Sequence, residues 1–194
     1  MKKTLMILLF CSIKMIFAQE NARDYLSTGD SFTLDNTEFF LNWSAKKSKI
    51  LTVEQYLPRD EKIEDFTHLV MYNFFNHDID MEFAARQKIE SLQKSTKDDK
   101  YAIINMAESP DGKEYVIDYS VSSDPGAKVP FLEYNIYRFK KSDRMPNKPL
   151  LIFSYTKRYY GEDLKAAKKL ISRERDAMLT EVISFQIPEI KPVD

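Results

Sequence analysis

Apolar and polar residues alternate with a period of two along much of this chain, a pattern typical of β-strands. The runs 31–34 and 38–43 flank an Asp-Asn-Thr turn signal and predict a β-hairpin. The run from Ile50 to Tyr56 predicts a third strand, which should end at Leu57-Pro58 because proline has no backbone N–H to donate.

Residues 64–67 could form one helical turn, and the segment HLVMYNFFN that follows fits two structures. As a helix it would place Phe66, Val70 and Phe74 on one face. Its β-branched and aromatic content is more typical of a strand, which we favour.

Two segments have the spacing of amphipathic helices. From Asp80 to about Ser95, apolar residues recur every three or four positions, and Asp78 or Asp80 can cap the first turn. A second stripe predicts a long helix that Pro188 and Pro192 end. Its members are Leu164, Ala167, Ile171, Met178, Val182 and Phe185.

Between these helices, strand-forming runs at 101–107, 114–121, 129–140 and 149–159 are separated by turn signals, of which Pro110-Asp111-Gly112 is the strongest. Four strands joined by short turns predict an antiparallel meander. Apolar residues fall on both faces of the run 131–139, so both faces of the sheet need cover.

We therefore predict an α+β fold: an antiparallel β-sheet meander packed by the long C-terminal helix on one face and partly by the middle helix on the other. The single domain should span 31–187. Residues 19–30 are polar and predict a flexible leader, and 188–194 predict a C-terminal tail.

The first eighteen residues have the pattern of a secretory signal peptide: early lysines, an apolar run too short to span a bilayer, and a small residue at Ala18. We expect export to the periplasm or the medium. Lipid attachment at Cys11 is not favoured, because Phe10 stands where lipoprotein processing needs a small residue.

Removing residues 1–18 takes away three lysines and no acidic residue, so the formal charge changes from -1 to -4. It also removes the only cysteine, which excludes disulfides, thiol nucleophiles and cysteine-ligated metals from the exported chain. The mild acidity argues against nucleic acid as a partner. No transmembrane segment is expected after Ala18.

Candidate chemistry is sparse, and we expect no cofactor. His77, Asp78 and Asp80 stand close together and could bind a hard or borderline cation, although acidic residues there also fit a helix start. Asp118 and Glu133, on neighbouring predicted strands, could be paired carboxylates for glycoside hydrolysis, a pairing that a charged sheet also produces by chance. Neither a nucleophile elbow nor a phosphate-binding glycine loop is present.

Tyrosines are the more suggestive feature. They concentrate in the predicted sheet, and a phenol suits an interface because its ring is apolar and its tip polar. One interpretation is a ligand surface on the face that the C-terminal helix leaves bare; the other is packing at the sheet margin with hydroxyls in water. The candidate ligand residues are Tyr115, Tyr119, Tyr134, Tyr137 and Tyr155.

The tract EQYLPRDEKIEDFTHLV resembles a tract of small exported bacterial proteins of unknown function, in which a Tyr-x-Pro strand end leads through Gly-Glu to a Trp-Thr turn. Asp60 stands at the glycine, Glu61 matches the glutamate, and Phe66 replaces the tryptophan before Thr67. We predict that residues 58–65 are mainly a turn rather than a ligand site.

The order of elements looks like that of the PsbP-like α/β/α sandwich, whose members are mostly accessory or adaptor proteins. This resemblance implies a non-catalytic envelope protein that binds a protein, glycan or lipid partner. The alternative is a metal-dependent or hydrolytic enzyme centred on His77, Asp78 and Asp80.

Overall fold

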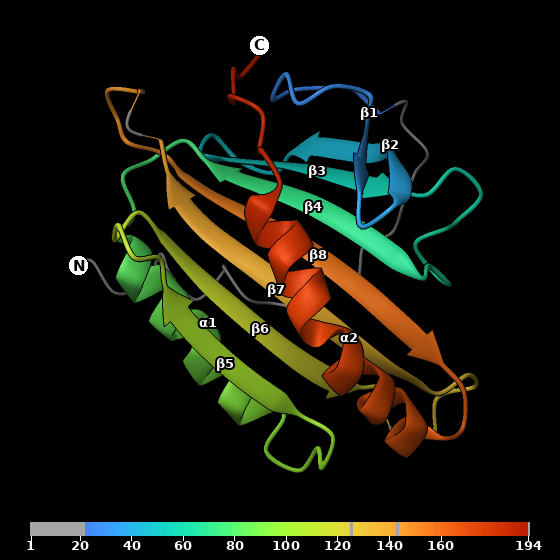
Figure 1. The fold of residues 1–194 in the computed structure, drawn as a ribbon. Helices are drawn as coiled ribbons and strands as arrows, with labels where there is room; N and C mark the ends of the chain where they lie inside the picture. Colours follow the sequence, from blue (N-terminus) through green and yellow to red (C-terminus); the bar gives the residue numbers. More distant parts are fainter. Residues whose placement is uncertain (1–21, 125, 143, 194) are drawn as a thin grey trace.

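The computed structural model describes residues 22–124, 126–142 and 144–193, so the predicted signal peptide lies outside the described residues. Within them the chain forms an α+β fold (Figure 1). The elements are β1 (Ser31–Leu34), β2 (Thr37–Lys46), β3 (Leu51–Leu57), β4 (His68–Phe75), α1 (Met81–Ser95), β5 (Ile103–Glu108), β6 (Glu114–Ser122), β7 (Phe131–Lys141), β8 (Leu150–Tyr160) and α2 (Leu164–Ser184).

All eight strands belong to one antiparallel sheet in the order β1-β2-β3-β4-β8-β7-β6-β5. The predicted meander is confirmed for β5 to β8. A second meander, β1 to β4, joins it where β4 pairs with β8 from His68↔Lys157 to Phe75↔Leu150. The strand interpretation of HLVMYNFFN is therefore correct, and the single turn expected at 64–67 is not helical.

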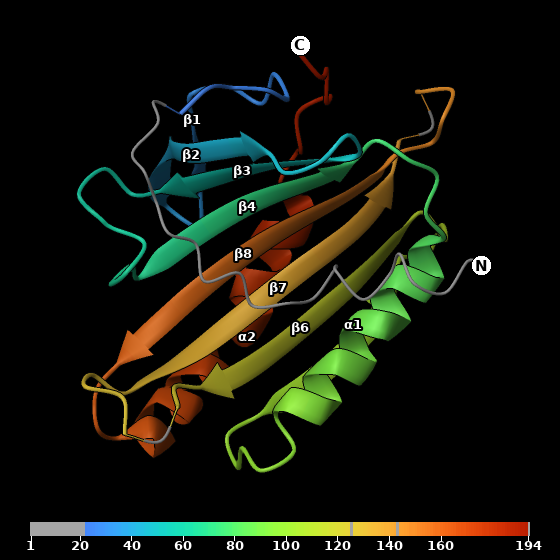
Figure 2. The same ribbon diagram turned by 180° about the vertical axis from the view of Figure 1, so that it is seen from behind.

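The two helices cover opposite faces of the sheet, as expected (Figures 1 and 2). On one face, Ile171 and Val182 of α2 pack on a core that includes Ile136 and Phe153. On the other face, Ala84, Ala85 and Leu92 of α1 pack on a cluster that contains Ile117 and Phe139. Side chains alternate between faces along each strand, which explains why neighbouring residues of β7 enter different cores.

The predicted hairpin turn is confirmed, and of the two candidate caps for α1 the structure uses Asp80. Asp35 and Asn36 close the β1–β2 hairpin with φ of 50° and 54°, values that aspartate and asparagine tolerate better than most residues. Asp80 caps α1 by accepting a 2.7 Å hydrogen bond from the Phe83 N–H, and Asp163 caps α2 in the same way at Ala166.

Parts of the expected leader and of the C-terminal tail contact the rest of the domain. Leu26 is fully buried, and the Glu54 carboxylate accepts hydrogen bonds from the N–H groups of Tyr25 at 2.7 Å and Leu26 at 2.9 Å. The N–H groups of Lys191 and Val193 donate to the carbonyls of Leu26 and Tyr25. The Glu54 carboxylate thus holds the leader, and the backbone carbonyls of the leader hold the tail.

Candidate functional site

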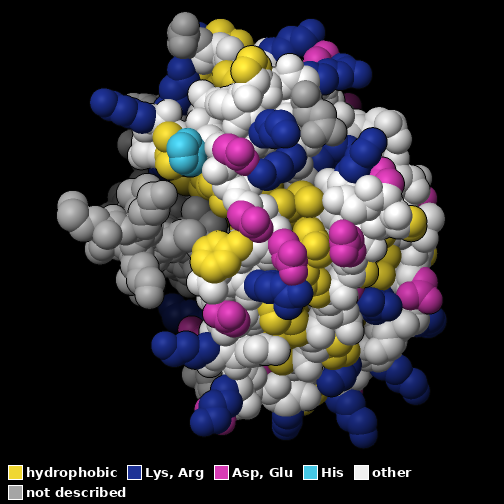
Figure 3. Space-filling model, turned by 90° about the vertical axis from the view of Figure 1, so that its left-hand side faces the viewer, with side chains coloured by type: hydrophobic (Ala, Val, Ile, Leu, Met, Phe, Trp, Pro, Cys, Tyr) yellow, Lys and Arg dark blue, Asp and Glu magenta, His cyan; other side chains and the backbone are white. Residues whose placement is uncertain are grey.

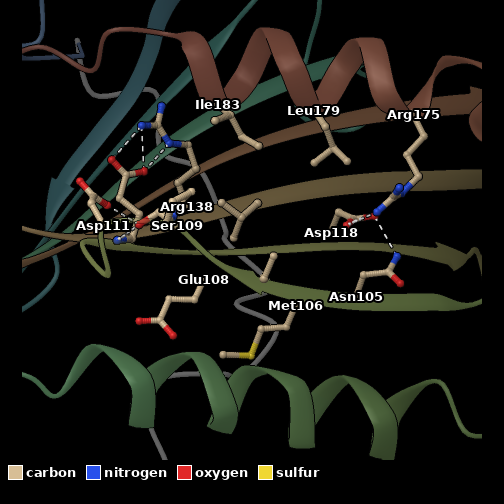
Figure 4. A pocket seen from close by; sticks show the side chains of 14 residues that line it. Asn105, Met106, Glu108, Ser109, Asp111, Asp118, Arg138, Arg175, Leu179 and Ile183 are labelled. Atoms are coloured by element: carbon tan, nitrogen blue, oxygen red, sulfur yellow. Dashed lines mark hydrogen bonds and ion pairs between the residues drawn. The ribbon is translucent and has the colours of Figure 1, made fainter.

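A cleft of about 510 Å³ lies between α2 and the strands β5 and β6, next to the outer edge of the sheet (Figure 4). We call it the α2–β5 cleft; it is lined by 105–111 and residues Glu114, Val116, Asp118, Arg138, Arg175, Leu179 and Ile183. Viewed from the side of β5 and α1, hydrophobic side chains form a band down this side of the molecule, with acidic side chains along it (Figure 3).

The cleft exists because α2 lies over β7 and β8 rather than over the end of the sheet. Its buried stripe, which includes Ala167, Ile171, Met178 and Val182, points at those strands. Leu179 and Ile183 lie on the flank of the helix and form one apolar wall with Val116 of β6. Ile183 stays 47% exposed, a high value for an isoleucine.

One end of the cleft is closed by an ion pair between α2 and the sheet. Arg175 donates to both oxygens of Asp118, from Nε and from Nη2, each at 2.8 Å. Asp118 is buried and also accepts from the Tyr134 hydroxyl at 3.0 Å and from Asn105 Nδ2 at 3.1 Å. The hydrogen bonds that Arg175 donates to Asp118 raise the pKa of Arg175, so its guanidinium stays charged.

The other end is closed by Arg138, which is only 5% exposed. Its Nε and Nη2 donate to the Glu114 carboxylate at 2.9 and 3.0 Å. Its Nη1 donates to the carbonyls of Val182 and Phe185 at 3.0 and 2.8 Å, which satisfies acceptors at the C-terminal end of α2. Arg138 thus fixes the end of α2 to the sheet and sets the width of the cleft.

The polar side chains of the cleft make hydrogen bonds and ion pairs within the protein. Both arginines hold a carboxylate in bidentate geometry, and the lining contains no histidine, lysine or cysteine. Its one hydroxyl, on Ser109, donates to Asp111 at 2.7 Å and accepts from the N–H of Glu114, so it belongs to the β5–β6 turn. The Ser109 hydroxyl and the Asp111 carboxylate are thus both held in the turn.

The five candidate tyrosines do not share a surface. Tyr134 and Tyr155 lie on the α2 face and are 1% and 0% exposed, with their hydroxyls donating to Asp118 and Asp35. Tyr115, Tyr119 and Tyr137 lie on the α1 face, where they pack in the cluster under α1. Their distribution follows from the register, since Tyr119 pairs with Asn135 while Tyr134 pairs with Ser120.

On the α1 face, Tyr119 and Tyr137 form a small aromatic platform. Their ring centroids are 5.6 Å apart, and Lys88 Nζ lies 5.0 Å from one centroid and 4.4 Å from the other. Burial raises the pKa of Tyr119. Lys88 of α1 lies over both rings, so the platform is part of the helix-to-sheet contact.

The alternative metal site is not assembled. Asp80 is the cap of α1, and Asp78 forms an ion pair with Lys141 of β7, which lowers the pKa of Asp78. Across the described residues, no group of three or more His, Cys, Asp or Glu side chains could hold a metal ion. Asp80 therefore acts at the start of a helix, as one of the two interpretations of this acidic stretch predicts.

The carboxylate pair also needs correction. Asp118 faces α2, whereas Glu133 lies on the opposite face, where it accepts from Arg158 Nε at 2.8 Å. Asp118 pairs with Ile136 and Val121 pairs with Glu133, so three residues along the strand separate the two positions in the register. Residues an odd number of steps apart point to opposite faces, so these carboxylates cannot share a substrate.

The charged tract 58–65 is a structured turn, as predicted. Glu61 accepts from the N–H groups of Thr67 and His68, at 2.7 and 3.1 Å, and from the Thr67 hydroxyl. Phe66 is buried beneath the guanidinium of Arg158, which lies 3.7 Å from the ring centroid. Glu61 and Thr67 therefore fix the backbone at the start of β4.

The cleft itself was not predicted, although the sequence carries signals for it. Arg138 falls on the apolar side of the alternation in β7, with Leu132, Tyr134 and Ile136. Arg175 follows Ile171 by four residues and so borders the apolar stripe of α2. A charge at an apolar position needs a buried partner, and the identity of that partner depends on strand order.

Comparison with known proteins adds a family but no activity. Residues 26–187 match the model of an uncharacterised protein family. Neither curated proteins nor solved structures gave a match. No helix among the described residues is both long and apolar enough to cross a membrane.

Proposed function

Because the chain belongs to this uncharacterised family, we propose a function from its geometry: it is a non-catalytic, exported accessory protein that binds a partner in the α2–β5 cleft. The observation that carries the proposal is the cleft itself, an apolar channel whose ends are braced by two bidentate ion pairs.

A braced cleft favours binding because its shape is formed before a partner arrives. Arg138 and Arg175 each tie α2 to the sheet, at opposite ends of the channel. Between them lie Val116, Leu179 and Ile183, an apolar surface that a partner can remove from water. Apolar walls with a few fixed polar groups are typical of ligand sites.

The proposal includes the cell compartment and the fold analogy expected from the sequence. The signal-peptide pattern of residues 1–18 supports export to the periplasm or the medium. An antiparallel sheet with helices on both faces supports a PsbP-like sandwich, in which accessory roles are common. An envelope protein, a glycan and a lipid are the partner classes to test.

The test is affinity capture from the envelope and secreted fractions of the native cells, with the purified chain as bait. Ala107 is exposed on β5 and lines the cleft, so Ala107→Trp would fill the channel. Leu170 lies nine residues from Leu179 on α2, on the opposite side of the helix, so Leu170→Trp is a matched control.

We expect the wild type and Leu170→Trp to capture the same partner and Ala107→Trp to lose it. Both variants should first be shown to unfold cooperatively, like the wild type. If all three baits capture the partner equally, or if none captures any, the proposed role of the cleft is wrong.

A further inference from the structure

The cleft opens beside a strand that is paired on one side only. β5 is the last strand of the sheet and pairs with β6 from Ile103↔Ser120 to Glu108↔Tyr115 without a register shift. A flat edge strand exposes a row of backbone donors and acceptors to which another chain can add. The opposite edge strand, β1, is shorter, with four residues against six.

The hydrogen-bond pattern identifies which backbone groups of β5 point outward. The Ser109 N–H donates to the Glu114 carbonyl at 2.8 Å, so this pair is hydrogen-bonded across the β5–β6 ladder. Hydrogen-bonded pairs alternate in an antiparallel ladder. The N–H and C=O groups of Ile104, Met106 and Glu108 therefore face away from β6, and no described residue contributes a backbone partner to them.

β5 has few of the features that usually protect an edge, and its one charged residue, Glu108, is the last of the strand. Its sequence, IINMAE, contains no proline and no lysine, and its pairing has no bulge. Natural proteins use such features to prevent chains from adding to their sheets. Asn105 and Ala107 are exposed on the side of the cleft, and Ile104 and Met106 are half-buried on the other side.

Charge at the cleft favours a basic partner. The lining has four carboxylates and two arginines; Arg175 pairs with Asp118, and both Arg138 and the neighbouring Lys140 pair with Glu114. The remaining acids, Glu108 and Asp111, are exposed at the end of β5, where Glu108 points toward α1 and Asp111 lies in the β5–β6 turn (Figure 4). Lys113 lies 4.0 Å from Asp111, and both of these side chains are more than half exposed. A second copy of this chain would bring the same acidic rim, whereas a lysine or arginine would complement it.

We infer that the partner is an extended polypeptide segment that adds to β5 as a further strand of the sheet. Alternate side chains of the segment pack against Leu179 and Ile183 in the cleft, and a lysine or arginine lies beside Glu108 and Asp111. Backbone pairing supplies affinity and the cleft supplies selectivity. This inference rests on the proposed function and narrows its partner to one class.

The test starts from a displayed library of random peptides of about seven residues, the length of an ordinary strand. Selected against the purified chain, the enriched peptides should alternate apolar residues with polar ones and carry lysine or arginine. Met106→Pro removes an outward N–H from β5, and Met106→Leu keeps that N–H with a similar apolar side chain.

We expect Met106→Pro to weaken peptide binding about tenfold or more and Met106→Leu to leave it nearly unchanged. In case Met106→Pro fails to fold, the selected peptide is also made with its alternate amides N-methylated, which removes donors without altering the protein. Methylation of the amides that would donate to β5 should abolish binding, and methylation of the other set of amides should not.

Three results would overturn the inference. The first is that no peptide is enriched. The second is that peptide binds equally to Met106→Pro and Met106→Leu, and the third is that methylation of either set of alternate amides leaves binding unchanged. Self-association of the chain through β5 that excludes peptide would also count against it. If Ala107→Trp abolishes partner capture while Met106→Pro does not, the cleft remains the site and only the strand-addition inference fails.

Discussion

Arg175 and Asp118 meet in two parallel hydrogen bonds of 2.8 Å, which join the middle of α2 to β6 across one end of the α2–β5 cleft. Asp118 is buried, whereas the Arg175 side chain is one-third exposed. The pair is therefore asymmetric. Without Arg175 the Asp118 carboxylate would be a buried charge without its cation, whereas without Asp118 the guanidinium could still contact water.

The first prediction concerns this pair. Arg175→Lys replaces a planar fork with a single ammonium, which cannot satisfy both oxygens of Asp118. We expect the free energy of unfolding to fall by about 1–3 kcal/mol, measured by urea denaturation. Arg173→Lys, at an exposed neighbouring position, is the control and should change it by less than about 0.5 kcal/mol. Equal effects would mean that the bidentate geometry is unimportant.

The second prediction tests the packing of α2. Ile171 is 1% exposed on the buried stripe, and its neighbour Leu170 is 37% exposed. Ile171→Ala should lower the free energy of unfolding by about 2–5 kcal/mol because it leaves a cavity. Leu170→Ala should lower it by less than about 1 kcal/mol. If Ile171→Ala changed the free energy of unfolding only slightly, the packing of α2 on the sheet would contribute little to stability.

The third prediction concerns the turn before β4. Glu61→Ala removes the acceptor shared by Thr67 and His68, so we expect the free energy of unfolding to fall by about 1–3 kcal/mol. Asp60→Ala, at the exposed preceding residue, should be nearly neutral. Capture of the partner should survive in both variants, and its loss in Glu61→Ala would move the binding site to this turn.

The fourth prediction concerns pH. Burial raises the pKa of Glu54 above its ordinary value of about 4.5, although Thr28 and the leader N–H groups oppose the shift. A carboxyl whose pKa is higher in the folded state stabilises the fold most when it is protonated in both states. Its contribution is therefore complete below about pH 4.5 and is lost as the pH rises through the folded pKa.

Glu54→Gln isolates this effect because glutamine does not titrate. The free energy of unfolding of the wild type minus that of the variant should be larger at pH 4 than at pH 8. Urea denaturation of both proteins at the two pH values gives this difference directly. A difference that grows with pH would mean that the ionised carboxylate is favoured in the fold.

Local structure was largely predictable from the sequence, because it depends on signals close together in the chain. The hairpin at Asp35-Asn36, the cap at Asp80 and the apolar stripe around Ile171 each needed only a short window. The helices were also assigned correctly to opposite faces, since β7 alternates with apolar residues on both sides.

The candidate site was not predictable, because it depends on how distant segments pair. The pairing of β4 with β8 makes one sheet from two meanders and leaves β5 at its edge. The placing of the tyrosines has the same cause: whether Tyr134 and Tyr119 share a face depends on their register. Composition identifies side chains suited to an interface, but only register decides which of them meet.

The most direct test of the central claim is photo-crosslinking from inside the cleft. A photoreactive amino acid at Ile183, which lines the cleft, should form a covalent adduct with the partner in the native envelope or secreted fraction. The same amino acid at Leu170, on the far side of α2, should form none. An adduct at Leu170 but not at Ile183, or none at either position, would contradict the assignment of the α2–β5 cleft as the binding site.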